Sequence, residues 1–430
     1  YLIEIDFGYS IAAHSSENVS HLPSASLIAQ ALPEAEILEL PLSQCCGLSS
    51  SAIISWAQTS ETQEHEHNNK DPTNRQNVPL VIMLHGFPDT SLTFGADIHQ
   101  HFSEKGFDVV VPTMPGYEPS SVRPLYFISV IAEDLRLWLQ YFNRTTVHVV
   151  GHDWGSVVAE VGALRYPNMM TTVTLIAVPA NVLQGFLIAP RQLLHSWYFF
   201  FFQIPIAPLL WLKYADGVNY LHLSWGKYSN YDTPPVILQD GTVNNPYGAS
   251  LQAVFQGGKD AAGVLTSTIS YYRQNFGALL IWPLLLCLAV PAVCTFGRSS
   301  WLFSLLLFFT LCSLSTLASI VLMRFSETSS TPIDIFNAIR FSLRQFVESL
   351  QLASSRTNEL HVPTLGIAGL KDQCILPELY NISMVQQRHL FHAGMDVVFV
   401  PNGSHWVHRE WTHGLCTALD QFWESTSTQR

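Results

Sequence analysis

The residue with the clearest chemical potential in this sequence is an aspartate that stands between two glycines. Asp153 is the centre of the pattern Gly-His-Asp-Trp-Gly at 151–155, directly after the apolar run 147–150. Small residues two positions before and after a central residue allow a sharp strand-to-helix turn, which lifts the central side chain above the sheet. A carboxylate presented in this way can act as a nucleophile. The pattern alone is weak, because a simple turn with a helix-capping aspartate looks the same.

Two further residues have the types that such a nucleophile needs. Asp372 lies just beyond the apolar run 364–368, and His405 lies just beyond the apolar run 397–400. A histidine that a carboxylate orients is a common general base. Each residue also has an ordinary interpretation, since most of the 17 histidines are expected on the surface or in the core and a loop aspartate often caps a helix. Their positions after strands favour a nucleophile, an acid and a base in this chain order.

A third element of the site is expected after the first buried run, 78–84. The sequence His85-Gly86-Phe87-Pro88 follows this run and brings a glycine-containing turn to the end of a strand. Backbone N–H groups in such a turn, together with the N–H group that follows the nucleophile, can stabilise a developing oxyanion. The predicted donors are the backbone N–H groups of Phe87 and Trp154.

These motifs together resemble the epoxide hydrolase branch of the α/β-hydrolases, which also contains haloalkane and haloacetate dehalogenases. The resemblance covers most of the chain from about residue 78 to the C-terminus, and the combination of motifs is highly specific. The matching segments are HGFPD (85–89), PTMPGYEPS (112–120), GHDWG (151–155), VPTLGIAGLKD (362–372) and GSHW (403–406). The order nucleophile, acid and base is also that of α/β-hydrolases.

The resemblance implies a reaction in two covalent steps. Asp153 would open an electrophilic carbon and form an alkyl-enzyme ester, and His405, oriented by Asp372, would activate the water that hydrolyses the ester. In epoxide hydrolases two tyrosines of the cap protonate the alkoxide, and Tyr198 and Tyr272 stand where these tyrosines are expected. Tyr271 is the alternative to Tyr272 if the register is shifted by one residue.

Three functions remain open at this stage. The favoured one is the hydrolysis of an apolar epoxide to a vicinal diol, with water as the second substrate and with neither a metal nor an organic cofactor. A haloalkane or haloacetate dehalogenase is the alternative, since Trp154 could hold a departing halide. An inactive membrane-associated protein that retains the α/β-hydrolase fold is the alternative from another class.

The elements that must position these residues alternate between strands and helices. Continuous apolar runs predict strands at 78–84, 108–111, 147–150, 172–178, 364–368 and 397–400, and helical spacing predicts helices at 127–142 and 414–423. This alternation predicts an α/β fold with a mostly parallel, doubly wound sheet. The expected core comprises 61–180 and 358–430, with a helical cap at 181–357, whereas residues 1–60 form a segment of uncertain structure.

The cap contains an apolar insertion at 278–324 that is unusual for the family. No charged residue lies between Arg273 and Arg298 or between Arg298 and Arg324, so each interval approaches the length of a membrane span. The preferred interpretation is a helical hairpin that anchors the enzyme in the membrane of the endoplasmic reticulum. The two outer arginines then place the catalytic domain in the cytosol. A retained intron and a soluble extension of the cap are the alternatives.

Composition excludes other classes of function. The net charge of −12 and the scattered distribution of only 21 basic residues argue against a nucleic-acid surface, which needs clustered Lys and Arg. The seven cysteines contain no Cys-x-x-Cys pair, so neither a zinc site of that kind nor a disulfide framework is expected.

Overall fold

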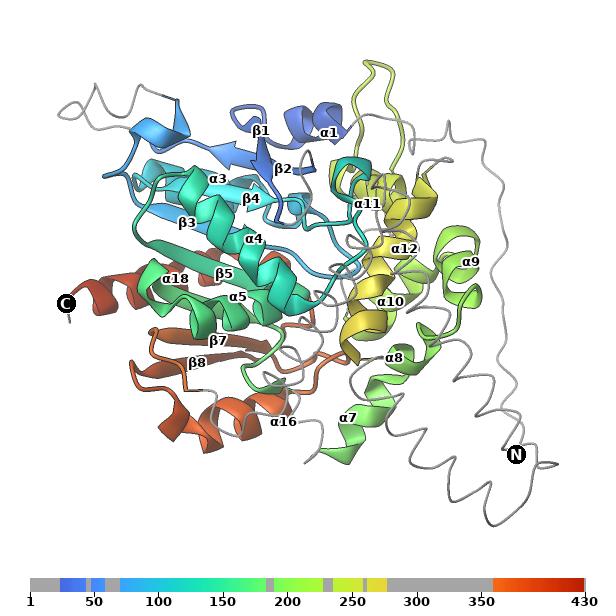
Figure 1. Cartoon of the computed structure of the whole chain (residues 1–430). Coiled ribbons are helices and arrows are strands. Elements are labelled where there is room, and N and C mark those ends of the chain that lie inside the picture. The colour runs from blue at the N-terminus through green and yellow to red at the C-terminus, as the bar shows by residue number, and fades with distance from the viewer. Residues whose placement is uncertain are drawn as a thin grey trace, which may run out of the picture.

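A mostly parallel sheet of eight strands forms the centre of the part of the chain that the structure describes (Figure 1). The computed structural model describes residues 24–43, 48–58, 70–182, 189–226, 235–257, 261–276 and 359–428. The strands are β1 (Glu36–Pro41), β2 (Ser49–Ser55), β3 (Leu80–Leu84), β4 (Asp108–Pro112), β5 (Val147–His152), β6 (Met170–Ile176), β7 (Thr364–Gly369) and β8 (Met395–Val400).

The order of the strands is that of a doubly wound sheet. They lie in the order β1-β2-β4-β3-β5-β6-β7-β8. The pairs β1–β2 and β2–β4 are antiparallel, whereas all pairs from β4 to β8 are parallel. The predicted α/β fold class is therefore confirmed, and an antiparallel hairpin extends one edge of the sheet.

Helices cover both faces of the sheet and one of its ends (Figure 1). The helices α4 and α5 lie on one face and α3 and α18 on the other, whereas α7 to α12 gather at one end as a cap. Their bounds are α1 (Ser24–Ala31), α3 (Ala96–Glu104), α4 (Ile128–Tyr141), α5 (Trp154–Arg165), α7 (Pro190–His195), α8 (Trp197–Phe201), α9 (Ala207–Tyr214), α10 (Gly217–Trp225), α11 (Pro246–Gln256), α12 (Ala261–Tyr272), α16 (Pro377–Tyr380), α17 (Val407–Glu410) and α18 (Thr412–Ser427).

The central strands form because their residues are apolar and buried on both faces. Every residue of β3, β4 and β7 is buried, as expected for parallel strands that helices cover on both sides. The strands at 80–84, 108–112, 147–152, 170–176, 364–369 and 395–400 lie where the apolar runs predict them. The helices α4 and α18 also lie where helical spacing predicts them.

The strand β1 at one edge of the sheet and its neighbour β2 were not predicted. In β1 exposed and partly exposed positions dominate, including its glutamates, and β2 begins with three serines. An edge strand with this composition has no continuous apolar run, so the sequence pattern does not mark it. Both strands lie within residues 1–60, and they extend the core sheet rather than forming a separate unit.

The parallel strands bring the expected functional residues to one edge of the sheet. The chain leaves β3, β5, β7 and β8 at their carboxyl ends, and the segments with Phe87, Asp153, Asp372 and His405 follow these ends. The carboxyl edge of a parallel sheet is where ligands bind in open α/β folds. The cap helices cover this edge (Figure 1).

The apolar insertion predicted at 278–324 lies outside the described residues. Among the residues that the structure does describe, no helix combines the length and the apolar character that a membrane span requires.

Candidate active site

The nucleophile candidate Asp153 stands on a sharp turn between β5 and α5. Its backbone has φ 52° and ψ −117°, a conformation that residues other than glycine rarely adopt. The two flanking glycines make this turn sterically feasible. A Cβ atom at Gly151 would lie 2.2 Å from the carbonyl oxygen of Gly155, and one at Gly155 would lie 2.1 Å from that of Leu84. The Gly-x-Asp-x-Gly pattern is therefore required by the close approach of three backbone segments.

The loop after β3 contacts the carboxylate of Asp153 directly. The backbone N–H of Phe87 donates a hydrogen bond to Asp153 Oδ1 at 2.8 Å. A Cβ atom at Gly86 would lie 2.4 Å from the Cβ and Oδ1 atoms of Asp153, so only glycine allows this approach. The second expected donor, the N–H of Trp154, belongs to the first residue of α5, directly after the nucleophile. Of the two predicted donors, the N–H of Phe87 is therefore the one that forms a hydrogen bond with the carboxylate in this structure.

His405 lies between the two aspartates of the candidate triad. Its Nε2 atom is 3.5 Å from Asp153 Oδ2, and its Nδ1 atom is 2.9 Å from Asp372 Oδ2. The other oxygen of Asp372 accepts hydrogen bonds from the backbone N–H groups of Cys374 at 2.7 Å and Ile375 at 3.0 Å. Asp372 is therefore held in place by its own loop and in turn fixes the imidazole ring.

Burial and charge act in opposite directions on His405. Burial alone would lower its pKa, but the charges of Asp372 and Asp153 and their hydrogen bonds outweigh it and raise the pKa to about 10. The imidazole is thus protonated at neutral pH. Because the charge of Asp153 contributes to this shift, removal of that charge would lower the pKa of His405.

His85 and Pro88, the other members of the first motif, support the loop after β3. His85 is fully buried, and its Nε2 atom accepts a hydrogen bond from the backbone N–H of Met114 at 2.9 Å. Burial lowers the pKa of His85 to about 4, so the ring is neutral and can accept this bond. The Phe87–Pro88 peptide bond is cis, and the carbonyl of Pro88 lies 3.0 Å from His222 Nε2.

The cap contributes two buried tyrosines opposite the nucleophile. Tyr198 and Tyr272 line a cavity of about 30 Å³ together with Asp153 and Trp154. Burial raises the pKa of both phenols well above the ordinary value, so both remain proton donors. The remaining wall of the cavity is apolar and consists of Val157, Val178, Val182, Phe199, Phe276 and Ile375.

The structure distinguishes Tyr272 from its neighbour Tyr271. The hydroxyl of Tyr271 donates to the carbonyl of Pro115 at 2.8 Å, and its ring contacts Tyr126. Tyr272 instead contacts Tyr198, with ring centroids 5.7 Å apart, and lines the cavity with Asp153. Of the two neighbouring tyrosines, Tyr272 is thus the one that lines the cavity with Asp153.

Sequence reasoning missed Cys374 as a neighbour of the site. Its buried thiol lies 3.1 Å from the hydroxyl of Tyr198, and its backbone N–H donates to Asp372. Cys374 therefore connects the acid loop to one of the cap tyrosines. No motif marks it, because a single cysteine two residues after a loop aspartate has no distinctive pattern.

Comparison with known proteins gives the family. Residues 79–410 match the model of the alpha/beta hydrolase fold. The chain belongs to this family. The matched region of this α/β-hydrolase contains the elbow, the acid and the base as well as the cap between them.

Curated relatives of this α/β-hydrolase include epoxide hydrolases. Human epoxide hydrolase 4 is 32% identical over 150 residues, which are 34% of this chain and 41% of the relative. Epoxide hydrolase 3 of Xenopus tropicalis is 27% identical over 207 residues, which are 46% of this chain and 53% of the relative. The chain thus spans roughly half the length of the curated relatives it matches.

Solved structures resemble this α/β-hydrolase over nearly their whole length. The epoxide hydrolase of Bacillus megaterium matches with a TM-score of 0.52 and 15% identity, covering 90% of this chain and 99% of that chain. The epoxide hydrolase of Vigna radiata matches with a TM-score of 0.53 and 13% identity, covering 91% and 98%. At this level of identity the likeness shows the fold.

Proposed function

We propose that this α/β-hydrolase hydrolyses an apolar epoxide to a vicinal diol through an ester on Asp153. The observation that carries the proposal is the placement of Asp153. Its Oδ1 atom accepts the N–H of Phe87 and its Oδ2 atom lies 3.5 Å from His405 Nε2, and the residue lines a cavity with two buried phenols. The curated relatives named epoxide hydrolase support the same activity.

The first step is the opening of the epoxide ring. A carboxylate oxygen of Asp153 attacks one ring carbon, a new C–O ester bond forms, and the C–O bond of the ring breaks with its electron pair moving to oxygen. The resulting alkoxide takes a proton from Tyr198 or Tyr272. A carboxylate needs no prior deprotonation to attack, so His405 is not consumed in this step.

The second step is the hydrolysis of the ester. His405 removes a proton from water, and the hydroxide adds to the carbonyl carbon of Asp153. The tetrahedral oxyanion is stabilised by the N–H groups of Phe87 and Trp154. Collapse of this intermediate breaks the ester C–O bond. The departing alkoxide takes the proton of the new carboxylic acid, which releases the diol and regenerates the Asp153 carboxylate, and the proton held by His405 returns to the ionised tyrosine.

The apolar wall of the cavity supports an apolar substrate. Most of the other residues that line the cavity are aliphatic or aromatic. Their side chains offer no hydrogen bonds to a substrate, as is the case for Val157, Val182 and Phe199. Burial of apolar substrate surface here contributes roughly 25 cal/mol per Å². The orientation of the epoxide oxygen then depends on the two phenols.

A dehalogenase is the second candidate because of Trp154. Its indole Nε1 atom is buried beside the phenol of Tyr272, and the centroids of the two rings lie 5.0 Å apart. An N–H group next to the nucleophile could stabilise a departing halide. Halide release from haloalkanes or haloacetate, without diol formation from epoxides, would favour this function.

The proposal is tested by a single turnover in ¹⁸O-labelled water with enzyme in excess over a panel of small epoxides. The expected result is a diol without label and a protein that gains one ¹⁸O in the peptide containing Asp153. Asp153→Ala should give neither product. Label in the diol after the first turnover would mean direct attack by water, and no turnover of any epoxide or halide would favour an inactive protein.

A membrane location is a separate proposal that rests on the sequence of 278–324. We propose that this apolar segment attaches the protein to the membrane of the endoplasmic reticulum with the catalytic domain on the cytosolic side. After fractionation of cells without detergent, the intact chain should be found in the membrane pellet. A chain that lacks 278–324 should be found in the soluble fraction instead. Intact protein in the soluble fraction would overturn this proposal.

A further inference from the structure

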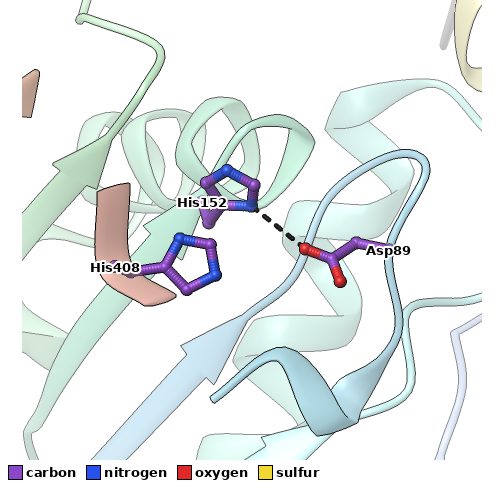
Figure 2. A group of neighbouring side chains, drawn as sticks. All are labelled: Asp89, His152 and His408. Atoms are coloured by element: carbon purple, nitrogen blue, oxygen red, sulfur yellow. Dashed lines mark ion pairs between the residues drawn. The ribbon is translucent and has the colours of Figure 1, made fainter. Parts of the chain in front are cut away.

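Three buried side chains next to the candidate active site lie close together, and His152 and Asp89 point toward each other (Figure 2). Asp89 comes from the loop after β3, His152 ends β5, and His408 lies in α17. All three are fully buried. Each offers one ligand atom, and these atoms all lie within 4.8 Å of one another.

The hydrogen bond of His152 fixes the state of its ring. Its Nε2 atom lies 3.0 Å from the backbone carbonyl of His405. A carbonyl only accepts, so Nε2 must carry a proton, and in a neutral imidazole Nδ1 then presents a lone pair. This lone pair faces Asp89 Oδ2 at 3.4 Å. Two acceptors that face each other in a buried site repel unless a proton or a cation lies between them.

The other polar atoms of the cluster already have partners. Asp89 Oδ1 accepts from the backbone N–H of Thr90 at 2.8 Å and from the hydroxyl of Tyr247 at 2.6 Å. His408 Nε2 lies 2.7 Å from Thr93 Oγ1. What remains without a hydrogen bond is Asp89 Oδ2, His152 Nδ1 and His408 Nδ1.

A proton would satisfy this arrangement only in part. Protonation of His152 would give a buried ion pair with Asp89, but His408 Nδ1 would still lack a partner, which is unusual for a buried polar atom. A divalent cation can instead take one ligand atom from each of the three residues. Two imidazole nitrogens and one carboxylate oxygen form a donor set that suits Zn²⁺ and related first-row cations.

We propose that Asp89, His152 and His408 bind a divalent cation of the zinc type. Tetrahedral zinc with bonds of about 2.0–2.1 Å separates its ligands by about 3.3–3.5 Å. The 3.4 Å between His152 Nδ1 and Asp89 Oδ2 agrees with this separation. Any pair of ligand atoms near the 4.8 Å limit must close by about 1.3–1.5 Å when the cation binds.

The site joins the three chain segments that carry the functional groups. Asp89 follows Phe87 by two residues, His152 directly precedes Asp153, and His408 follows His405 by three residues. Because the ligands are fully buried, the cation is structural: it holds the loop after β3, the nucleophile turn and the base loop together. The ligands are positioning residues, and the inference does not depend on which reaction the site performs.

The first test measures metal bound to the intact full-length protein. The protein is incubated with Zn²⁺, freed of unbound metal by gel filtration and analysed by mass spectrometry for metals. About one bound zinc per chain is expected, and removal with 1,10-phenanthroline should lower the melting temperature until Zn²⁺ is restored. No retained zinc, or a melting temperature that chelation does not change, would overturn the proposal.

A matched pair of variants locates the cation. His99 and His408 are both fully buried, and each has one ring nitrogen near a hydroxyl and the other without a hydrogen bond. His408→Gln should lose the zinc and its response to chelation, whereas His99→Gln should retain both. Retention of one zinc by a folded His408→Gln variant would contradict the site. If this variant does not fold, the zinc content of the wild-type protein and the effect of chelation on its melting temperature still test the proposal.

A third measurement excludes binding at the surface. Glu359, His361 and His392 form an exposed group with similar spacing on the described part of the chain. A His361→Ala/His392→Ala variant should keep its zinc if the buried site is the one that binds. Co²⁺ in place of zinc should then give the strong visible absorption of a tetrahedral nitrogen and oxygen site. Loss of all metal in this variant would assign binding to the surface group and overturn the proposal.

Discussion

At the scale of single residues, Asp153 has an unfavourable backbone conformation, with positive φ, but its side chain makes favourable contacts. A side chain at positive φ costs on the order of 1–3 kcal/mol. The contacts with Phe87 N and His405 exist only because this backbone presents the carboxylate above the sheet. Such strain is typical of functional positions, and the glycine pattern around Asp153 made this turn predictable from the sequence.

Removal of the cap hydroxyls should slow the opening of the epoxide. Tyr198→Phe and Tyr272→Phe each keep the buried ring, so we expect ester formation to fall by about ten- to a hundredfold in each and much further in the double variant, within the about 10²–10⁴-fold range of general acid catalysis. Single-turnover kinetics measures this rate. Tyr271→Phe is the control, since its hydroxyl bonds Pro115 instead of facing the cavity, and an equal loss of rate there would contradict the assignment.

Replacement of the base should trap the ester. His405→Gln leaves the attack by Asp153 possible but removes the group that activates water, so we expect a covalent adduct to accumulate. Intact-protein mass spectrometry should show a mass increase equal to that of the epoxide. His222→Gln changes another buried histidine outside the triad and should accumulate no adduct. A His405→Gln variant that turns over at the wild-type rate would contradict the assigned role.

At the scale of elements, helix α5 carries the nucleophile at one end and a buried acid within it. Glu160 is buried, and its Oε1 atom accepts a hydrogen bond from the backbone N–H of Asn181 at 2.8 Å. Burial raises the pKa of Glu160 to about 7 from its ordinary value near 4.5, and the hydrogen bond only partly opposes this. The folded state therefore favours the neutral carboxyl group.

Stability should respond to pH through Glu160. Because its folded pKa is the higher one, the contribution of the neutral carboxyl is complete below about pH 4.5 and is lost as the pH rises through about 7. Glu160→Gln keeps an acceptor for Asn181 and cannot ionise. The free energy of unfolding of this variant should equal that of the wild type near pH 4.5 and exceed it by about 3 kcal/mol above pH 8. Urea unfolding at both pH values measures the difference, and equal stability at high pH would contradict a raised pKa.

The elements that position the site were predictable to different degrees. The strands β3, β4 and β7 are buried at every position, and burial on both faces gives an apolar signal that sequence alone reveals. The edge strand β1 and its neighbour β2 carry glutamates and serines and depend on their pairing partners instead. Helix periodicity located α4 and α18 but did not resolve the short cap helices.

At the scale of the whole molecule, one buried carboxylate joins four distant segments. Asp108 pairs with Arg75 at 2.7 Å and Arg144 at 2.9 Å, and it accepts the backbone N–H of Ala57 at 3.0 Å. Asp108 and Arg75 are completely buried. The partners of such a group have no access to water, so the loss of its charge cannot be compensated by hydration.

Asp108→Asn should destabilise the whole fold. Loss of the charge removes the carboxylate that two buried guanidinium groups bind, and we expect the free energy of unfolding to fall by about 3–5 kcal/mol. Urea denaturation monitored by tryptophan fluorescence measures this change. Glu378→Gln removes the exposed pair with Arg191 and should have no measurable effect. Similar losses in both variants would contradict the dominant role of the buried cluster.

The site itself was predictable where each residue sits in a local motif, and not where side chains meet by folding alone. The triad and Phe87 follow strands in recognisable segments. Tyr198 and Tyr272 were located through resemblance rather than through a pattern of their own. Asp89, His152 and His408 are separated by long stretches of chain and show no ligand spacing, so only the fold brings them together.

The insertion of the cap between β6 and β7 has a consequence for how the protein is made. These strands pair in parallel, Val173 with Thr364 to Ile176 with Ile367, although a long stretch of chain separates them. Closing so large a loop is slow and entropically costly. During synthesis the half that carries Asp153 leaves the ribosome long before the half that carries His405. We therefore expect the nascent chain to hold its nucleophile in a partly built sheet, with an open edge that chaperones must protect until the last strands dock.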